Sequence, residues 1–284
     1  MLLEEFGVSV KYETQFCAAG IRTDPRLHSG LSHGHRCASL AGDDPEDSQP
    51  GWGDFWNIVT SERALATYRI TVSAAAVATI LNGLFGLLLA WVLTRYDFPG
   101  KRLIDAAVDL PFALPTAIAG LALVTLFAQN GWFGRVLEPL GIKVAYAPLG
   151  IMIAMFFTSI PFVVRTVQPV LEDMSADVEE AARSLGATSW QTFTHITWPT
   201  IFPAFLAGAS LSFARSLGEF GSIVFISGNL PFQTEVTALL VFIRLDEYDY
   251  PAAAALAFVM LVMAFFMLLV TNLIQARRLR YAER

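Results

Sequence analysis

Two charged side chains lie inside a long apolar stretch of the sequence. Arg215 and Glu219 are four residues apart between Ile201 and Ile226, so on a helix they share one face and can form an ion pair. An arginine at the centre of a membrane helix costs about 2.5 to 3.5 kcal/mol on insertion scales, so a compensating carboxylate is expected. The pair can be purely structural, or Arg215 can attract an anion that crosses the membrane beside it. Ser216, next to Arg215, serves either helix packing or hydrogen bonding to that anion.

The sequence contains none of the motifs expected of a nucleotide-hydrolysing enzyme or a zinc protease. The P-loop pattern G-x-x-x-x-G-K-[ST] is missing, because Gly100-Lys101 lacks the upstream glycine, and H-E-x-x-H does not occur. Asp105 and Asp109 are spaced i, i+4 at the start of an apolar stretch, where helix-end roles are expected rather than acid–base catalysis. We therefore expect no catalytic residue and no cofactor, and ATP hydrolysis would have to come from another chain.

A polar N-terminal tail holds the remaining residue types with metal-binding chemistry. His33, His35 and Cys37 alternate with other residues, and Cys17 lies upstream. This spacing fits no closed zinc pattern, so no metal site is expected. Because both cysteines lie in this tail, they cannot form the disulfide framework of a secreted domain.

The composition places the rest of the chain in a membrane. Of its 284 residues 55% are hydrophobic and only 15% are charged, and the mean hydropathy is +0.52. These values predict an all-α polytopic membrane protein. The net charge of -6 comes without a dense run of basic residues, which excludes a nucleic-acid-binding function because no cations are available to neutralise phosphates.

Five apolar stretches are long enough to cross a bilayer, which takes roughly 20 residues of helix. They are Ile70–Leu93, Leu103–Phe127, Ala147–Val164, Ile201–Ile226 and Pro251–Ile274.

The segments between these stretches alternate in their Lys and Arg content, which sets membrane orientation. One side carries Arg95, Lys101, Arg102, Arg165, Arg183, Arg277, Arg278, Arg280 and Arg284, and the other carries Arg135, Lys143 and Arg244. The richer side is predicted to face the cytoplasm, which places the C-terminus inside. The protein is accordingly expected in the inner membrane, in contact with lipid.

The loop of residues 172–199 is too long for a simple turn and is predicted to form a helix-turn-helix on the cytoplasmic face. Ser175 can cap a first helix, and Gly186 supplies its C-terminal stop. Thr188 and Gln191 fit a capping box that begins a second helix carrying Trp190. The first helix has an apolar stripe formed by Val178, Ala181, Ala182 and Leu185. This stripe either packs back on the membrane domain or enters the groove of a partner protein.

The same loop matches a known signature. Glu180-Ala181-Ala182 is followed by three residues, Gly186, nine residues, Ile196, one residue and Trp198-Pro199. This pattern resembles the EAA signature of the permeases of binding-protein-dependent ABC importers. Trp198 is a mild departure, since members of that family usually have leucine before the proline.

Flanking segments extend the resemblance from about Gly53 to the C-terminus. They are Leu110–Thr116, Thr158–Pro169, Arg215–Gly221, Thr234–Thr237 and Asp249–Ala252. These segments resemble the T-type permeases of sulfate/thiosulfate importers, and the last two favour sulfate over the related molybdate and tungstate importers.

The resemblance implies the type I ABC importer permease fold and a set of partners. A cytoplasmic ATP-binding subunit would drive transport, a second permease of the W type would complete the pore, and a periplasmic or extracellular anion-binding protein would deliver the substrate. The residues implied in coupling to the ATPase are Glu180, Ala181, Ala182, Gly186, Trp190, Ile196 and Pro199. The alternatives from other classes are a membrane-embedded enzyme, which would have no need of this docking loop, and a structural membrane scaffold, which would have no need of the pair formed by Arg215.

The N-terminus departs from the family. Members have a first membrane helix before the segments described above, whereas residues 1–52 contain no apolar stretch of that length. We interpret residues 1–52 as an atypical tail that is disordered or translated in a wrong frame, and residues 53–284 as the transmembrane domain.

Overall fold

The computed structural model describes residues 51–282, and for Ala176 and residues 275–282 it describes the backbone alone. Throughout this range the regular structure is helical, without a strand. The elements are α2 (Trp52–Val59), α3 (Glu62–Arg95), α4 (Lys101–Val108), α5 (Leu110–Ala113), α6 (Thr116–Phe127), α7 (Gly134–Leu137), η2 (Glu138–Leu140), α8 (Pro148–Asp173), α9 (Ala176–Ser184), α10 (Ser189–Thr192), the π-helical turn η3 (Phe193–Thr197), α11 (Trp198–Leu217), α12 (Gly221–Ile226), α13 (Thr237–Asp246) and α14 (Tyr250–Ala282).

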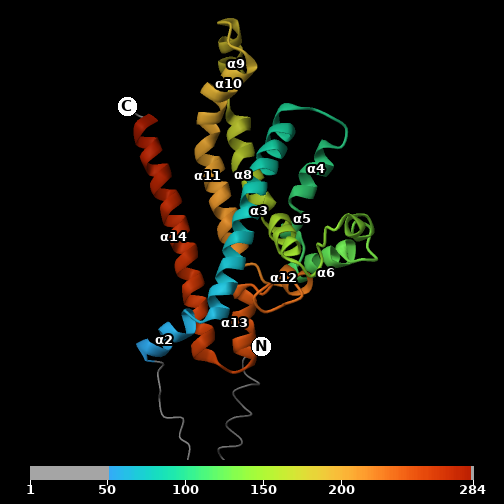
Figure 1. Cartoon of the computed structure of the whole chain (residues 1–284). Coiled ribbons are helices and arrows are strands. Elements are labelled where there is room, and N and C mark those ends of the chain that lie inside the picture. The colour runs from blue at the N-terminus through green and yellow to red at the C-terminus, as the bar shows by residue number, and fades with distance from the viewer. Residues whose placement is uncertain (1–50, 283–284) are drawn as a thin grey trace, which may run out of the picture. The chain divides into compact units, whose positions relative to one another are not determined.

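Three long helices, α3, α8 and α11, pack against one another and form the core that positions the functional residues (Figure 1). Small residues allow their backbones to approach, as is common between membrane helices. At Gly208 of α11 an added Cβ would lie 2.1 Å from Oγ1 of Thr166 and 2.9 Å from the Cα atom of Val163 in α8. Gly208 therefore allows the backbones of α8 and α11 to approach closely.

The two ends of this bundle carry different elements (Figure 1). We call the end that carries Arg95, α9 and α10 the loop end, and the end that carries Arg63, α2 and α13 the far end. α14 begins beside α13 at the far end and runs toward the loop end. The last described turns of the chain therefore lie at the same end as the 172–199 loop.

Four helices in the described part of the chain are long and apolar enough to cross a membrane. They are Glu62–Arg95, Pro148–Asp173, Ser189–Leu217 and Tyr250–Ile274. The prediction of a fifth continuous span at Leu103–Phe127 was wrong. That segment is divided into α4, α5 and α6, of which only Thr116–Phe127 is a shorter apolar helix.

The division of this segment has a clear backbone cause. Pro111 and Pro115 lack an N–H and disfavour helical geometry in the residues before them. Pro111 occupies the first turn of α5, and Pro115 is the N-cap of α6. Leu114, between the two helices, has extended backbone angles.

The predicted span Ile201–Ile226 is also divided. α11 ends at Leu217, Gly218 is its C-cap, and α12 begins at Gly221. Glu219 and Phe220 therefore lie in a break within the apolar segment, and this break contains one partner of the predicted ion pair.

The 172–199 loop differs from the predicted helix-turn-helix in its second half. α10 passes without a break through the π-helical turn η3 into α11, so Ser189–Leu217 is one helix of 29 residues. The second helix of the motif is therefore the first part of a membrane span. The predicted tail of residues 1–52, with His33, His35 and Cys37, lies outside the described residues apart from Gly51 and Trp52.

Candidate functional site

The first helix of the loop, α9, begins and ends as the sequence predicts. Ser175 is its N-cap, and its Oγ accepts a hydrogen bond from the backbone N–H of Asp177 at 3.2 Å. Gly186, just beyond the helix, has φ +86°, and no atom lies within 4 Å of an added Cβ. The glycine is therefore required by its left-handed backbone and not by lack of space.

The apolar stripe of α9 does not pack back on the membrane domain. Leu185 is 89% exposed, Val178 and Ala181 are exposed, and Ala182 is half-buried. Glu180 lies beside them and is also exposed. A helix with a solvent-facing apolar stripe and a defined start and stop is suited to binding a partner protein.

The second half of the loop contributes an aromatic surface. Thr188 and Gln191 form the predicted capping box. Trp190 in α10 is 71% exposed and stacks on Phe193 with ring centroids 5.8 Å apart. Phe193 itself packs edge-on against Trp91 of α3, so of this aromatic pair only Trp190 projects freely.

The remaining signature residues lie where the loop joins the span. Ile196 belongs to the π-helical turn η3, and Pro199 lies in the first turn of α11. A π-helical turn inserts an extra residue into a helix and is found frequently at functional sites. The structure thus places the signature on one continuous unit from α9 to the start of α11.

Sequence reasoning missed the role of Glu179, which is buried, unlike the other residues of α9 whose side chains the structure describes. Its Oε1 accepts a hydrogen bond from Arg95 Nη2 at 2.5 Å and another from Thr197 Oγ1 at 3.4 Å, and its Oε2 lies 3.6 Å from Arg183 Nη2. Glu179 therefore ties α9 to the end of α3 and to η3. Glu179 and Arg95 are 84 residues apart, so no local spacing could have indicated their contact.

Arg215 and Glu219 form an ion pair across the break between α11 and α12. Arg215 Nη1 lies 2.5 Å from Glu219 Oε2, in a charge contact that lacks hydrogen-bond geometry. The other oxygen, Oε1, accepts hydrogen bonds from the backbone N–H and the hydroxyl of Ser222. Glu219 therefore holds the last turn of α11 and the first turn of α12 together.

The two members of this pair differ in exposure. The Glu219 side chain is fully buried, whereas the Arg215 side chain is 34% exposed. In the part of the chain whose side chains are described, the guanidinium of Arg215 pairs with Glu219 and donates no hydrogen bond. Arg215 is thus a fixed, partly exposed cation inside an apolar segment and has free donors for an anion.

Ser216 does not face the same way as Arg215. It is fully buried, and its Oγ lies 3.1 Å from Ser159 Oγ of α8. The cluster continues to Asn82 of α3, whose Nδ2 donates to the hydroxyls of Ser159 and Ser212. Ser216 therefore joins the three core helices, and sequence reasoning did not identify the Asn82 cluster.

Asp109 lies at a helix end, where it is the C-cap of α4 and the N-cap of α5, whereas Asp105 lies within α4. Sequence reasoning missed that Arg165 binds both acids. Arg165 donates to both carboxylate oxygens of Asp109 from Nε and Nη2, at 2.8 and 2.7 Å. It also donates to the carboxylate and the backbone carbonyl of Asp105 and to the side chain of Gln168. This network fixes α4 and α5 on α8.

Comparison with known proteins assigns most of the helical region to one family. A family model described as "Binding-protein-dependent transport system inner membrane component" matches residues 82–280. "Sulfate transport system permease protein CysT" of Escherichia coli (strain K12) is 54% identical over 230 residues, which cover 81% of this chain and 83% of that protein. "Probable sulfate transport system permease protein cysT" of Nephroselmis olivacea is 50% identical over 236 residues, 83% of each chain.

Solved structures support the fold. A chain of a bacterial ABC transporter involved in the import of the acidic polysaccharide alginate matches with a TM-score of 0.69 at 17% identity, covering 96% of this chain and 99% of that one. The MetNI methionine ABC transporter matches with a TM-score of 0.57 at 16% identity, covering 75% and 95%. The resemblance drawn from the sequence is confirmed, as is the all-α permease fold.

Proposed function

Because the chain belongs to the binding-protein-dependent transport system inner membrane components, we propose that it is the permease subunit of an ABC importer for sulfate or thiosulfate. It is a multi-pass protein of the inner membrane, and it is not an enzyme. Relatives that are about half identical to this chain over four-fifths of its length are named sulfate transport permeases. This similarity favours sulfate over molybdate or tungstate as the substrate.

A positioned cation inside an apolar segment is the observation that carries this proposal. Arg215 keeps free donors and partial exposure, while the buried Glu219 holds it in place. A dianion such as sulfate needs hydrogen-bond donors when it leaves water, and an arginine supplies them in a fixed fork. Glu219 also offsets the charge of Arg215, which favours release, because conduction requires binding that is weak enough to reverse.

The exposed face of α9 is the proposed docking surface for the cytoplasmic ATP-binding subunit. Glu180, Ala181, Ala182, Gly186 and Trp190 form or shape this surface, and Ile196 and Pro199 lie where it joins α11. The chain has no nucleotide-binding motif of its own, so ATP can act on it only through contact with another subunit. On this proposal the loop end and the C-terminus are cytoplasmic.

Two further partners follow from the proposed role. The four long helices of this chain leave many large apolar side chains exposed, and lipid and a second permease of the W type would cover them. An anion-binding protein outside the membrane would deliver the substrate to the far end.

Complementation of sulfate uptake tests the proposal. The chain is expressed with its ATPase, second permease and binding protein in cells that lack their own sulfate and thiosulfate uptake. Growth on sulfate and uptake of radiolabelled sulfate that unlabelled thiosulfate inhibits are the expected results. Arg215→Gln should abolish uptake, whereas Arg135→Gln, which removes an exposed cation outside the apolar segment, should not. Uptake of molybdate without uptake of sulfate would refute the substrate assignment.

A further inference from the structure

We infer that α3 carries motion between the ATPase-docking unit at the loop end, which consists of α9, α10 and η3, and the segment of residues 227–236 at the far end. Glu179 and Glu235 are the positioning residues that hold the two ends of α3. The inference rests on the proposed function, since it requires an ATPase that moves α9. The two ends of α3 share one feature. At each end, an arginine in the terminal turn of α3 pairs with a buried glutamate from a neighbouring segment.

The clamp at the loop end joins α3 to α9. Arg95, the last residue of α3, donates to the buried carboxylate of Glu179 at 2.5 Å. The guanidinium carbon of Arg95 also lies 5.4 Å from the ring centroid of Trp91, one turn earlier in α3. An ion pair that is largely shielded from water resists separation, because breaking it leaves a buried charge without a partner. A displacement of α9 must therefore move the end of α3.

A second contact joins the same turn of α3 to the other half of the docking unit. Trp91 packs edge-on against Phe193, with ring centroids 5.6 Å apart, and Phe193 stacks on the exposed Trp190. Trp91 and Arg95 are four residues apart and lie on one face of the helix. One turn of α3 thus receives contacts from both α9 and η3.

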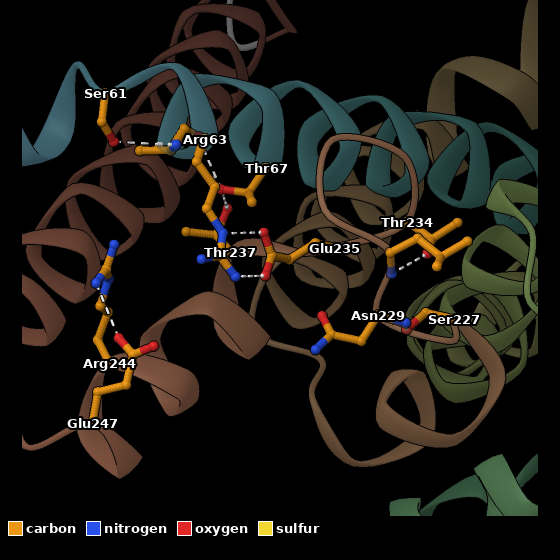
Figure 2. Close-up of polar contacts among 12 residues, drawn as sticks. Ser61, Arg63, Thr67, Ser227, Asn229, Thr234, Glu235, Thr237, Arg244 and Glu247 are labelled. Atoms are coloured by element: carbon orange, nitrogen blue, oxygen red, sulfur yellow. Dashed lines mark hydrogen bonds and ion pairs between the residues drawn. The ribbon is translucent and has the colours of Figure 1, made fainter.

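The clamp at the far end is a bidentate pair (Figure 2). Arg63, in the first turn of α3, donates from Nε to Glu235 Oε2 at 2.9 Å and from Nη2 to Oε1 at 2.6 Å. The Glu235 side chain is 0% exposed. The fork geometry fixes both distance and orientation, which a single contact would not do.

Two threonines of α3 extend this clamp along the helix. Thr71 Oγ1 accepts a hydrogen bond from the backbone N–H of Thr237 at 2.9 Å and lies 3.1 Å from its hydroxyl, and Thr67 Oγ1 accepts from the same hydroxyl at 3.4 Å. Thr237 begins α13. Three successive turns of α3 therefore hold the junction of residues 235–237.

The segment that precedes this junction is internally braced and strained. Thr234 Oγ1 accepts from the backbone N–H of Leu230, and Ser227 Oγ accepts from that of Asn229 (Figure 2). Asn229 and the exposed Phe232 have positive φ, +48° and +63°. A bulky residue in this conformation persists only where its surroundings enforce it, so the segment depends on its anchorage to α3.

α3 itself is suited to transmit a displacement. It runs for 34 residues, about 50 Å at 1.5 Å per residue, without a proline. α8 contains Pro161 and Pro169 within its length, and α11 contains Pro203, where helices bend. Of the three core helices, α3 is therefore the one expected to move as a rigid rod.

The test changes one end of α3 and measures the other in the assembled transporter. Phe232→Cys, with Cys17 and Cys37 replaced by serine, gives a reporter thiol at the far end. Its reaction rate with a membrane-impermeant maleimide is measured in proteoliposomes, with and without Mg-ATP plus vanadate. In the parent protein the rate should change roughly fivefold or more, the lower end of typical coupling between sites. With Glu179→Gln this change should be lost while the ATPase subunit still co-purifies.

The converse measurement uses Glu235→Gln, which lies far from the docking unit. Stimulation of ATP hydrolysis by the sulfate-loaded binding protein should fall to the unstimulated rate. Asp97→Asn at the loop end is the matched control, because it removes an exposed carboxylate that pairs with a neighbouring cation. This control should behave as the parent.

Swapping the two charges of the loop-end ion pair distinguishes loss of the contact from misfolding. Arg95→Glu combined with Glu179→Arg should restore the nucleotide response at position 232 that either single change removes. A parent protein without that response, or a Glu179→Gln protein that keeps it, would overturn the inference. Absence of sulfate uptake by a parent that shows the response would instead contradict the proposed substrate and leave the role of α3 standing.

Discussion

Glu219 binds Arg215 with one carboxylate oxygen and accepts hydrogen bonds from Ser222, in the first turn of α12, with the other. A single buried side chain therefore joins α11 and α12, which the apolar sequence predicted to be one continuous helix. The arginine side chain is partly exposed, whereas the glutamate side chain is buried. A charge pair of this kind allows a cation to remain at membrane depth without an unpaired charge in hydrocarbon.

The first prediction separates pairing from capping in this contact. Glu219→Gln keeps an oxygen that can accept from Ser222 but removes the charge that compensates Arg215. We expect a loss of about 3 kcal/mol, the low end of the range for breaking a buried pair, because the guanidinium is partly exposed. Thermal unfolding of the detergent-solubilised complex measures it. The double change Arg215→Gln with Glu219→Gln should be more stable than Glu219→Gln alone. Equal losses would mean that Glu219 does not compensate Arg215.

The second prediction concerns Gly186 and its left-handed backbone. Gly186→Val should redirect the chain between α9 and α10, since a β-branched residue is strained at φ +86°, by about 1 to 2 kcal/mol or more. The variant should insert into the membrane in normal amounts but fail to retain the ATPase subunit on purification. Gly186→Asn should retain it, because asparagine tolerates this conformation.

Gly141 supplies the matched control for this experiment. It also has positive φ, +77°, with open space around it, but it lies outside the 172–199 loop. Gly141→Val should strain the backbone equally and leave ATPase binding unchanged. Loss of binding in both valine variants would point to general damage, and retention in Gly186→Val would remove α9 as the docking element.

The structural elements that the sequence predicted correctly depend on local rules. Ser175 and Thr188 were identified as helix caps because an N-cap bond spans only two or three residues. Four spans were identified because a bilayer requires a continuous apolar helix. Hydropathy is averaged over a window, however, and does not register the breaks at Pro115 or Gly218, since the windows that contain them remain apolar on average.

The contacts that the sequence did not predict are long-range. Arg95 and Glu179 are 84 residues apart and Arg63 and Glu235 are 172 apart, and nothing in their spacing indicates a pair. Asn82 lies in the middle of an apolar stretch of sequence. Its partners on α8 and α11 can be identified only once the packing of the helices is known. Prediction of these contacts requires the tertiary fold, whereas the signature residues from Glu180 to Pro199 can be recognised one after another along the chain.

The third prediction concerns the network of Arg165. Arg165→Gln removes the donors to Asp105 and Asp109 and leaves two carboxylates near each other. Because both acids are about half exposed, the loss in free energy of unfolding should be moderate, about 1 to 2 kcal/mol. Neutralising both acids in the same protein should recover part of this loss. Lys101→Gln, which breaks an exposed pair with Asp97, should change the stability by less than about 0.5 kcal/mol.

The fourth prediction is the membrane orientation. The excess of Lys and Arg in the segments at the loop end predicts that this end lies in the cytoplasm. Reporter fusions after Arg102, near Ala187 and after Arg280 should report cytoplasm, and fusions near Gly141 and Asn229 should report the outside. A cytoplasmic signal at Gly141 would invert the assignment, and with it the surface assigned to the ATPase.

Uptake by a purified system tests the central claim most directly. The chain is reconstituted in proteoliposomes with its ATPase, the second permease and the binding protein, and radiolabelled sulfate accumulation is followed with and without internal ATP. We predict ATP-dependent accumulation that Arg215→Gln abolishes, that Arg215→Lys retains in part, and that Arg135→Gln leaves unchanged. Accumulation at the parental rate with Arg215→Gln, or no ATP-dependent accumulation by the parent, would contradict the account.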